Sequence, residues 1–191
     1  MANPFETLGL APTFALDLAA LEQRQRELNR AVHPDRHAGK SPGERRQALS
    51  RAMDINLAYR TLRDPASRAE ALFELLGAGS TRESTVSDPA LLMDMMEQRE
   101  ALEEARNAKD LVRLHGIGKT MAARERQVIQ ALEAAFAPLL SGAAGARQTD
   151  GKARPDASPE AAALREAQRL LAELRYVRRF AEEIAAFEDE S

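Results

Sequence analysis

The sequence Leu28–Arg46, LNRAVHPDRHAGKSPGERR, decides how the first part of this chain folds. Pro34 has no backbone N–H and disfavours helical geometry in the residue before it, so a helix entering this stretch should end near Val32. His33 and Asp35 are then expected on an exposed loop at the tip of a helical hairpin. Charged side chains held on a loop by a rigid scaffold suit docking to another molecule better than core packing.

Apolar or neutral residues on both sides of this loop recur at the spacing of an α-helix. In residues 16–32 and again in residues 43–63 they fall three or four positions apart, so each set lines one helical face. Ser41-Pro42 suits the start of the second helix, because serine caps a first turn and proline fits the first helical position. Asp64-Pro65 should end or break it. The two faces consist of Leu18, Leu21, Gln25, Leu28 and Val32, and of Ala48, Ala52, Ile55, Tyr59 and Leu62.

The composition of the 191-residue chain favours an all-α fold. Hydrophobic residues make up 44% of it and aromatic residues only 4%, and no stretch shows the sustained alternation of a strand. The absence of cysteine excludes disulfides, thiolate metal sites and a cysteine nucleophile. No segment approaches the roughly twenty apolar residues of a membrane helix, and Met1–Pro12 does not resemble an export signal. We therefore expect a cytoplasmic protein.

The order of helical and polar segments predicts two domains. A short helix over residues 66–76 should stop at Gly77, and the small, polar residues that follow are typical of a linker. Beyond it, three helical segments joined by short connections indicate a three-helix bundle. The expected helices of this bundle cover about 89–107, 110–137 and 160–187. The predicted organisation is a first domain over 1–76, a linker over 77–87 and a second domain over 88–191, with a mobile loop over 141–159.

The helix expected over residues 89–107 has two apolar faces. With each residue advancing about 100°, one face forms a core stripe of Leu91, Met95, Gln98, Leu102 and Ala105. Roughly opposite lie Leu92, Met93 and Met96, which are bordered by the carboxylates of Glu97, Glu100, Glu103 and Glu104. An exposed apolar patch with a polar rim is typical of a protein-binding surface. The same residues would equally suit a helix that is buried on both sides.

Charge is also unevenly distributed along a chain whose formal net charge is −3. Basic residues gather around the loop that contains His33. They are Arg24, Arg26, Arg30, Arg36, Lys40, Arg45 and Arg46. Together with the later run of glutamates, this distribution suggests two different partners, although each charge taken alone is more simply part of a solvated helix face.

Three segments of the first domain together resemble the J-domain, the module that recruits and activates DnaK-type chaperones. They are the His33-Pro34-Asp35 loop, the upstream Pro4–Leu10 (PFETLGL) and the downstream Ile55–Pro65 (INLAYRTLRDP). The resemblance implies that Asp35 pairs with an arginine of the chaperone's ATPase domain and that His33 and Pro34 shape the loop. It further implies that an acidic surface of the chaperone is met by Arg26, Arg30 and Arg36.

A J-domain followed by a linker and a three-helix bundle resembles the HscB family, the J-protein co-chaperones of iron–sulfur cluster assembly. Leu91–Glu104 (LLMDMMEQREALEE) resembles the segment with which that family binds the scaffold protein IscU, and Leu174-Arg175-Tyr176 resembles its L-R-[FY] segment. The resemblance implies a co-chaperone that delivers an IscU-type scaffold to a DnaK/HscA-type chaperone and stimulates its ATPase, which aids cluster transfer and maturation of iron–sulfur proteins. The implied scaffold-binding residues are Leu92, Met93, Met96, Glu97, Glu100, Glu104 and Tyr176.

The chain departs from this family in three places. Met96 stands where leucine is common, the 141–159 insertion is long, and Gly116 and Gly118 are poor interior helix residues that cost about 1 kcal/mol each. None of these departures falls on the residues that carry the resemblance, apart from the mild change at Met96.

Other interpretations of the sequence remain. A generic J-domain adapter for a different client is the main alternative, and a basic helical nucleic-acid binder, which would lack aromatic stacking residues, is the third. Gly118-Lys119-Thr120 ends like a phosphate-binding loop, but Arg113 occupies the position of the required first glycine. His33 with Asp35 lacks substrate-positioning groups, and His37 and His115 have no metal-ligand spacing. We therefore predict no catalytic residues, no cofactor and no metal.

Overall fold

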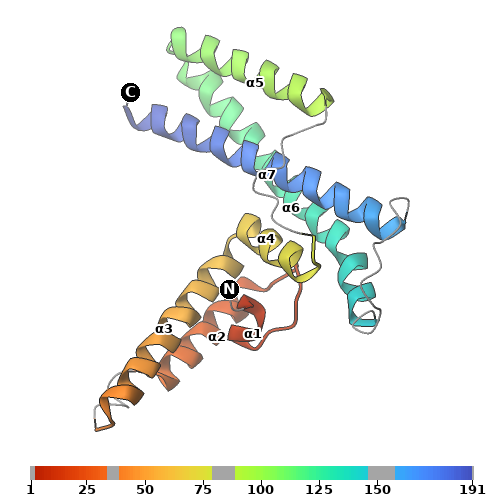
Figure 1. Ribbon diagram of the computed structural model, residues 1–191. Coiled ribbons are helices and arrows are strands. Elements are labelled where there is room, and N and C mark those ends of the chain that lie inside the picture. The colour runs from red at the N-terminus through yellow and green to blue at the C-terminus, as the bar shows by residue number, and fades with distance from the viewer. Residues whose placement is uncertain (1–2, 34–38, 79–88, 146–157, 191) are drawn as a thin grey trace. The chain divides into compact units, whose positions relative to one another are not determined.

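The computed structural model describes residues 3–33, 39–78, 89–145 and 158–190, and these residues form α-helices and no strand (Figure 1). This confirms the predicted all-α class. By its contacts the chain divides into two compact units, residues 1–80 and 81–191. None of the described helices is both long and apolar enough to cross a membrane. The helices are α1 (Pro4–Leu8), α2 (Leu18–Ala31), α3 (Pro42–Arg63), α4 (Pro65–Leu75), α5 (Pro89–Asn107), α6 (Leu111–Gly145) and α7 (Pro159–Glu190).

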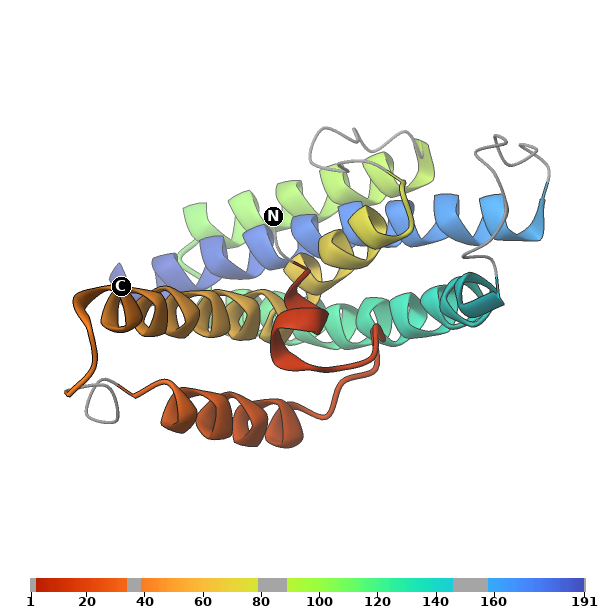
Figure 2. The ribbon, with the colours of Figure 1, turned by 60° about the horizontal axis from the view of Figure 1, so that its bottom comes forward.

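In the first unit, α2 and α3 form the predicted hairpin and lie side by side (Figure 2). Helix α2 ends at Ala31 with Val32 as its cap, as the proline that follows requires. Helix α3 begins with a capping box, in which the Ser41 hydroxyl accepts from the Glu44 N–H at 3.3 Å and the Glu44 carboxylate accepts from the Ser41 N–H at 2.9 Å. These two caps fix where the connecting loop begins and ends.

The core of the first unit follows the predicted stripe of α3. Ala48, Ile55 and Leu62 are buried, and the remaining stripe positions are partly buried. The stripe predicted for α2 is less accurate, because Leu18 is exposed. Leu18 is the first residue of α2, so no earlier turn of the helix lies beside it to help cover its side chain.

A buried arginine that sequence analysis did not single out joins three segments of the first unit. The Arg68 guanidinium, on α4, donates to the carbonyl oxygens of Leu62 and Phe14, at 2.6 Å each. It also lies 5.3 Å from the centre of the Phe14 ring. A cation that is 5% exposed is stable there because these carbonyl oxygens satisfy its donors. Arg68 thereby holds the loop before α2 against the junction of α3 and α4.

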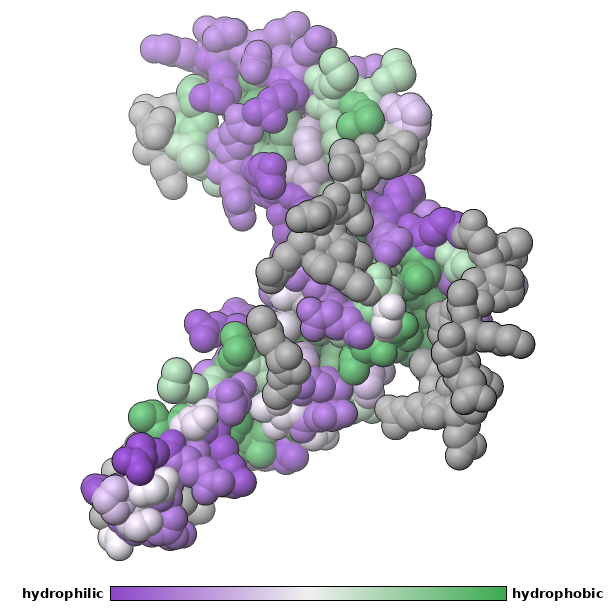
Figure 3. Space-filling model, in the orientation of Figure 1, coloured by the Kyte–Doolittle hydropathy of each residue, from purple (hydrophilic) through white to green (hydrophobic). Residues whose placement is uncertain are grey.

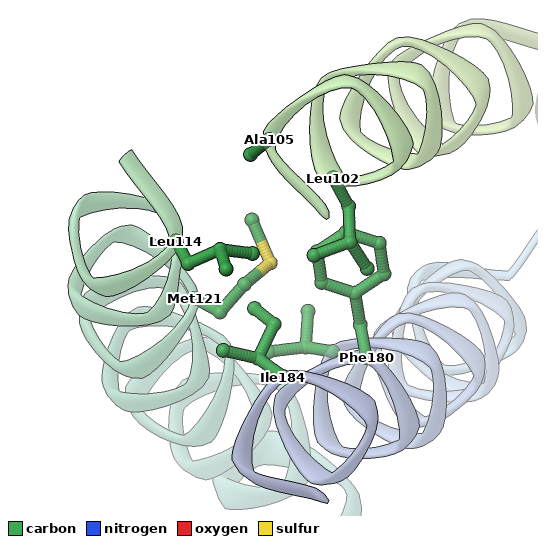
Figure 4. Packing of buried hydrophobic residues seen from close by; sticks show 7 residues of the cluster. Leu102, Ala105, Leu114, Met121, Phe180 and Ile184 are labelled. Atoms are coloured by element: carbon green, nitrogen blue, oxygen red, sulfur yellow. The ribbon is translucent and has the colours of Figure 1, made fainter. Parts of the chain in front are cut away.

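The second unit is the predicted bundle of three helices. Helices α6 and α7 pack along each other, and α5 completes the bundle at one end. Figure 4 shows side chains from all three helices meeting in one apolar cluster. The cluster consists of Leu102, Ala105, Leu114, Met121, Val177, Phe180 and Ile184. The core stripe of α5 is therefore the face that joins this helix to the other two.

Helix α6 is longer than predicted. The sequence suggested an end near residue 137 and a mobile loop from residue 141, but the helix continues through Pro138 to Gly145. Proline removes one hydrogen bond from the helix, whereas burial of Phe136 and Leu139 one turn apart stabilises its continuation. The start of the predicted loop was therefore wrong. The rest of that loop, residues 146–157, and the linker residues 79–88 lie outside the described residues.

Candidate functional site

The hairpin tip is the first candidate site. His33 is exposed just after the end of α2, whereas Pro34, Asp35 and Arg36 lie outside the described residues. Arg26 and Arg30 are exposed one turn apart on the face of α2 opposite Leu21. Helix α2 therefore presents positive charge on its outer face and leads directly to the loop that the sequence marks for docking.

Another basic residue near the tip has a structural role. Arg24 donates from Nε to the Leu8 carbonyl at 2.9 Å and lies 3.6 Å from the Glu27 carboxylate. A Cβ at Gly9, which has a φ of +66°, would come within 3.0 Å of the Arg24 guanidinium. Arg24 thus fixes α1 against α2. Among the described residues of α2, Arg26 and Arg30 remain on the outward basic face, where Arg26 also forms an ion pair with Glu22 at 3.1 Å.

The second candidate site is the outward face of α5. Leu92, Met93 and Met96 are 43%, 65% and 66% exposed, and we call these three residues the outer patch. On the other side of the helix, Leu91 and Leu102 are buried. The structure therefore excludes the alternative in which α5 is buried on both sides. Figure 3 shows hydrophobic surface over the first half of α5 beside strongly hydrophilic surface.

Carboxylates border the outer patch as predicted. Glu97, Glu100, Glu103 and Glu104 are all exposed. Glu104 forms an ion pair with Arg113 at the start of α6, at 2.9 Å. The rim is therefore a solvated acidic surface next to the exposed apolar residues.

Tyr176, which resemblance placed at the scaffold-binding surface, contacts the other side of α5. Its hydroxyl donates to the carbonyl oxygen of Met95 at 2.9 Å, and its ring centre lies 5.7 Å from that of Phe180. Burial raises the pKa of the Tyr176 phenol above its ordinary value. Tyr176 therefore joins α7 to the core-facing side of α5. Its hydroxyl does not lie at the outer patch, where it was expected.

A charged network that sequence analysis missed supports the same helix. Arg124, on α6, donates to the carboxylates of Asp94 on α5 and of Glu173 on α7, the latter at 2.8 Å. Arg169 also donates to Glu173, at 3.2 Å. Burial alone would lower the pKa of Arg124, but these hydrogen bonds raise it overall, so the guanidinium stays charged. The only sign of this network in the sequence was a carboxylate, Asp94, beside the core stripe of α5. Sequence spacing does not reveal which residue on another helix pairs with it.

The described residues contain neither the phosphate loop that Gly118-Lys119-Thr120 would need nor a group of metal-binding side chains. Gly118-Lys119-Thr120 lies inside α6, where the backbone N–H groups are used by the helix and cannot cradle a phosphate. The structure therefore excludes the phosphate-loop interpretation. Across residues 3–33, 39–78, 89–145 and 158–190, no three histidine or carboxylate side chains are placed to hold a metal ion.

The fold resembles that of solved HscB proteins. A structure of chaperone HscB from Vibrio cholerae matches with a TM-score of 0.74 over 98% of both chains, at 29% identity. Human co-chaperone protein HscB matches with a TM-score of 0.76 over 98% of this chain and 83% of the human chain, at 24% identity, which shows the fold alone.

Residues 87–185 match the family described as the HSCB C-terminal oligomerisation domain, and the chain belongs to that family. Relatives named co-chaperone protein HscB homolog include one from Shewanella loihica, 47% identical over 109 residues. Another, from Shewanella oneidensis, is 45% identical over 109 residues. Each match covers 56% of this chain and 63% of the relative's length.

Proposed function

We propose that this protein is a co-chaperone of iron–sulfur cluster assembly. It binds an IscU-type scaffold protein through α5, delivers it to a DnaK/HscA-type chaperone and stimulates that chaperone's ATPase through the His33–Asp35 loop. The observation that carries the proposal is the exposed outer patch, which lies opposite the buried stripe of α5 and within the segment that matches the HscB family. The names of its relatives support the co-chaperone role.

On the chaperone side, the basic face of α2 brings the two proteins together. Exposed arginines such as Arg26 and Arg30 attract an acidic surface and speed encounter. Asp35 then pairs with an arginine of the ATPase domain, as resemblance to the J-domain implies. Hydrolysis takes place in the chaperone, and this chain contributes only binding contacts.

On the scaffold side, the outer patch supplies most of the binding free energy. Leucine and methionine side chains that are 43–66% exposed gain from being covered, and methionine adapts its shape to a partner. Glu97, Glu100 and Glu104 select for basic residues on the scaffold and mainly affect rate and specificity. Tyr176 acts indirectly in this proposal, because it holds the helix that carries the outer patch.

A generic J-domain adapter is the second candidate, and capture of partners from a lysate distinguishes the two. Wild-type protein used as bait should retain both a DnaK-type chaperone and an IscU-type scaffold, identified by mass spectrometry. Asp35→Asn should lose the chaperone alone, and a variant with Leu92, Met93 and Met96 replaced by alanine should lose the scaffold alone. If the outer patch retains a different client, the adapter interpretation holds and the iron–sulfur role is lost.

A further inference from the structure

An exposed apolar surface on α3 is not used by the core of the first unit. Leu49, Met53 and Leu57 are between 52% and 64% exposed, and Figure 3 shows hydrophobic side chains along the outer edge of this helix. The three residues recur every four positions, so they lie within about 80° of one another. Buried Ile55 and Leu62 face roughly the opposite direction. We call the three exposed residues the α3 stripe.

Arginines stand at both ends of the α3 stripe. Arg46 lies one turn before it and Arg60 one turn after it, and both are exposed on the same arc of the helix. The helix advances about 21 Å between them, at 1.5 Å per residue. No carboxylate of α3 lies on this arc, since Asp54 is about 60° beyond its edge. The surface is therefore a row of apolar side chains with a positive charge at each end.

The spacing of the α3 stripe favours another helix as its partner. Side chains four residues apart form a ridge that packs into the matching groove of a second helix, with the two axes crossing at about −50°. Carboxylates beyond both ends of that helix's apolar residues would pair with Arg46 and Arg60. Two copies of the α3 stripe do not suit each other, because arginines would meet arginines.

An anionic membrane is a poorer fit for this surface. Helices that lie on membranes have a broad apolar face that commonly includes tryptophan or phenylalanine, and α3 contains neither residue. Polar Ser50, Asp54 and Thr61 lie directly beside the α3 stripe. The Asp54 carboxylate would be repelled by anionic headgroups, so a protein helix is the better occupant.

We propose that the α3 stripe docks an amphipathic helix of another protein, one whose apolar residues recur every four positions and are bounded at both ends by carboxylates. The three apolar side chains cover those of the partner, and Arg46 and Arg60 pair with its carboxylates. A contact of three apolar residues belongs to the small, transient class of interfaces, so binding is weak. This contact is separate from the His33–Asp35 loop and rests on neither the chaperone nor the scaffold role proposed above.

Fluorescence anisotropy with a labelled synthetic helix tests this surface on the full chain. The probe carries three leucines four residues apart, with glutamates three residues before the first and three after the last. Its control carries lysines in place of the glutamates. We expect wild-type protein to bind the glutamate probe about fivefold more tightly than the lysine probe. Replacing Leu49, Met53 and Leu57 together by serine should weaken binding of the glutamate probe about tenfold. The matched control replaces exposed Leu111 and Val112 on α6 by serine and should leave it unchanged.

Charge reversal shows whether the arginines set the preference. Arg46→Glu with Arg60→Glu should bind the lysine probe more tightly than the glutamate probe. Asp35→Asn should bind both probes like the wild type, so that loss of this contact and loss of the chaperone role are distinguishable. Circular dichroism should show unchanged helix content in the serine and charge-reversed variants, since the substituted side chains are exposed.

Three results would overturn the proposal. The first is equal binding of the two probes by the wild type, and the second is binding of the glutamate probe that survives the serine substitutions in the α3 stripe. The third is binding of the wild type, but not of that serine variant, to phosphatidylglycerol vesicles in place of the glutamate probe, which would assign the surface to lipid.

Discussion

At the scale of single residues, substitutions at the hairpin tip should change chaperone stimulation without changing the stability of the fold. His33 is exposed beyond the end of α2, so His33→Gln and Asp35→Asn should leave the helix content and melting temperature unchanged. Both variants should abolish stimulation of the chaperone in a single-turnover ATPase assay, because the paired charge and the loop shape are lost. Wild-type stimulation by both variants would remove the J-domain assignment.

Tyr176 is expected to stabilise the second unit in a pH-dependent way. Its pKa is raised by burial, so the neutral phenol is favoured in the folded state. The stability it contributes is therefore complete below the unfolded pKa of about 10 and is lost as the pH rises through the higher folded pKa. Tyr176→Phe should cost about 1 kcal/mol at neutral pH, because the hydrogen bond to Met95 is lost, and should reduce the loss of stability above pH 10.

Urea unfolding at several pH values measures both effects of this substitution. Tyr59→Phe, in the first unit, is the control for the loss of a hydroxyl elsewhere in the chain. An alkaline stability profile that is identical for wild type and Tyr176→Phe would contradict the role given to burial of this phenol.

Two glycines should respond in opposite directions to the same substitution. Gly116 lies within α6 with no atom within 4 Å of an added Cβ, so Gly116→Ala should stabilise the protein by about 0.5–1 kcal/mol. Gly9 has a φ of +66° and a crowded Cβ position, so Gly9→Ala should destabilise it. Thermal melting followed by circular dichroism gives both signs, and equal shifts for both variants would contradict this account.

At the scale of elements, α5 should tolerate changes on its outer face. Replacing Leu92, Met93 and Met96 together by alanine should weaken scaffold binding by more than about 2 kcal/mol in calorimetric titration. The melting temperature should change little, because alanine favours helix and these side chains are exposed. A large fall in melting temperature with unchanged scaffold affinity would mean that the outer patch is structural.

Local signals in the sequence were sufficient for most of the helices but not for their contacts. Prolines and capping residues located the ends of α2 and α3, and periodicity located the buried face of α5, because these depend on neighbours along the chain. The end of α6 was misplaced because Pro138 disfavours a helix locally, whereas tertiary burial of Leu139 favours its continuation. The hydrogen bonds of Arg68 and Tyr176 join segments far apart in sequence, so periodicity could not predict them.

At the scale of the whole molecule, the two proposed binding sites should differ in their response to salt. Chaperone stimulation relies on exposed charges such as Arg26 and Arg30, and salt reduces the Debye length from about 10 Å at 0.1 M to about 3 Å at 1 M. Scaffold binding relies on the outer patch, which salt does not screen. Raising the salt concentration should therefore weaken chaperone stimulation more than scaffold affinity, as measured by ATPase assays and calorimetry in matched buffers.

The charge network around Arg124 has a consequence for how this chain can diverge. One guanidinium satisfies carboxylates from two neighbouring helices, and Glu173 is 8% exposed. Loss of Arg124 alone would remove the cation that joins Asp94 to Glu173 and leave Arg169 to balance the buried Glu173 carboxylate, which is a cost for a single mutation. Asp94, Arg124 and Glu173 are therefore expected to be retained together or replaced together, so that the position of α5 is inherited as a unit while the residues on its outer face remain free to adapt to a changing partner.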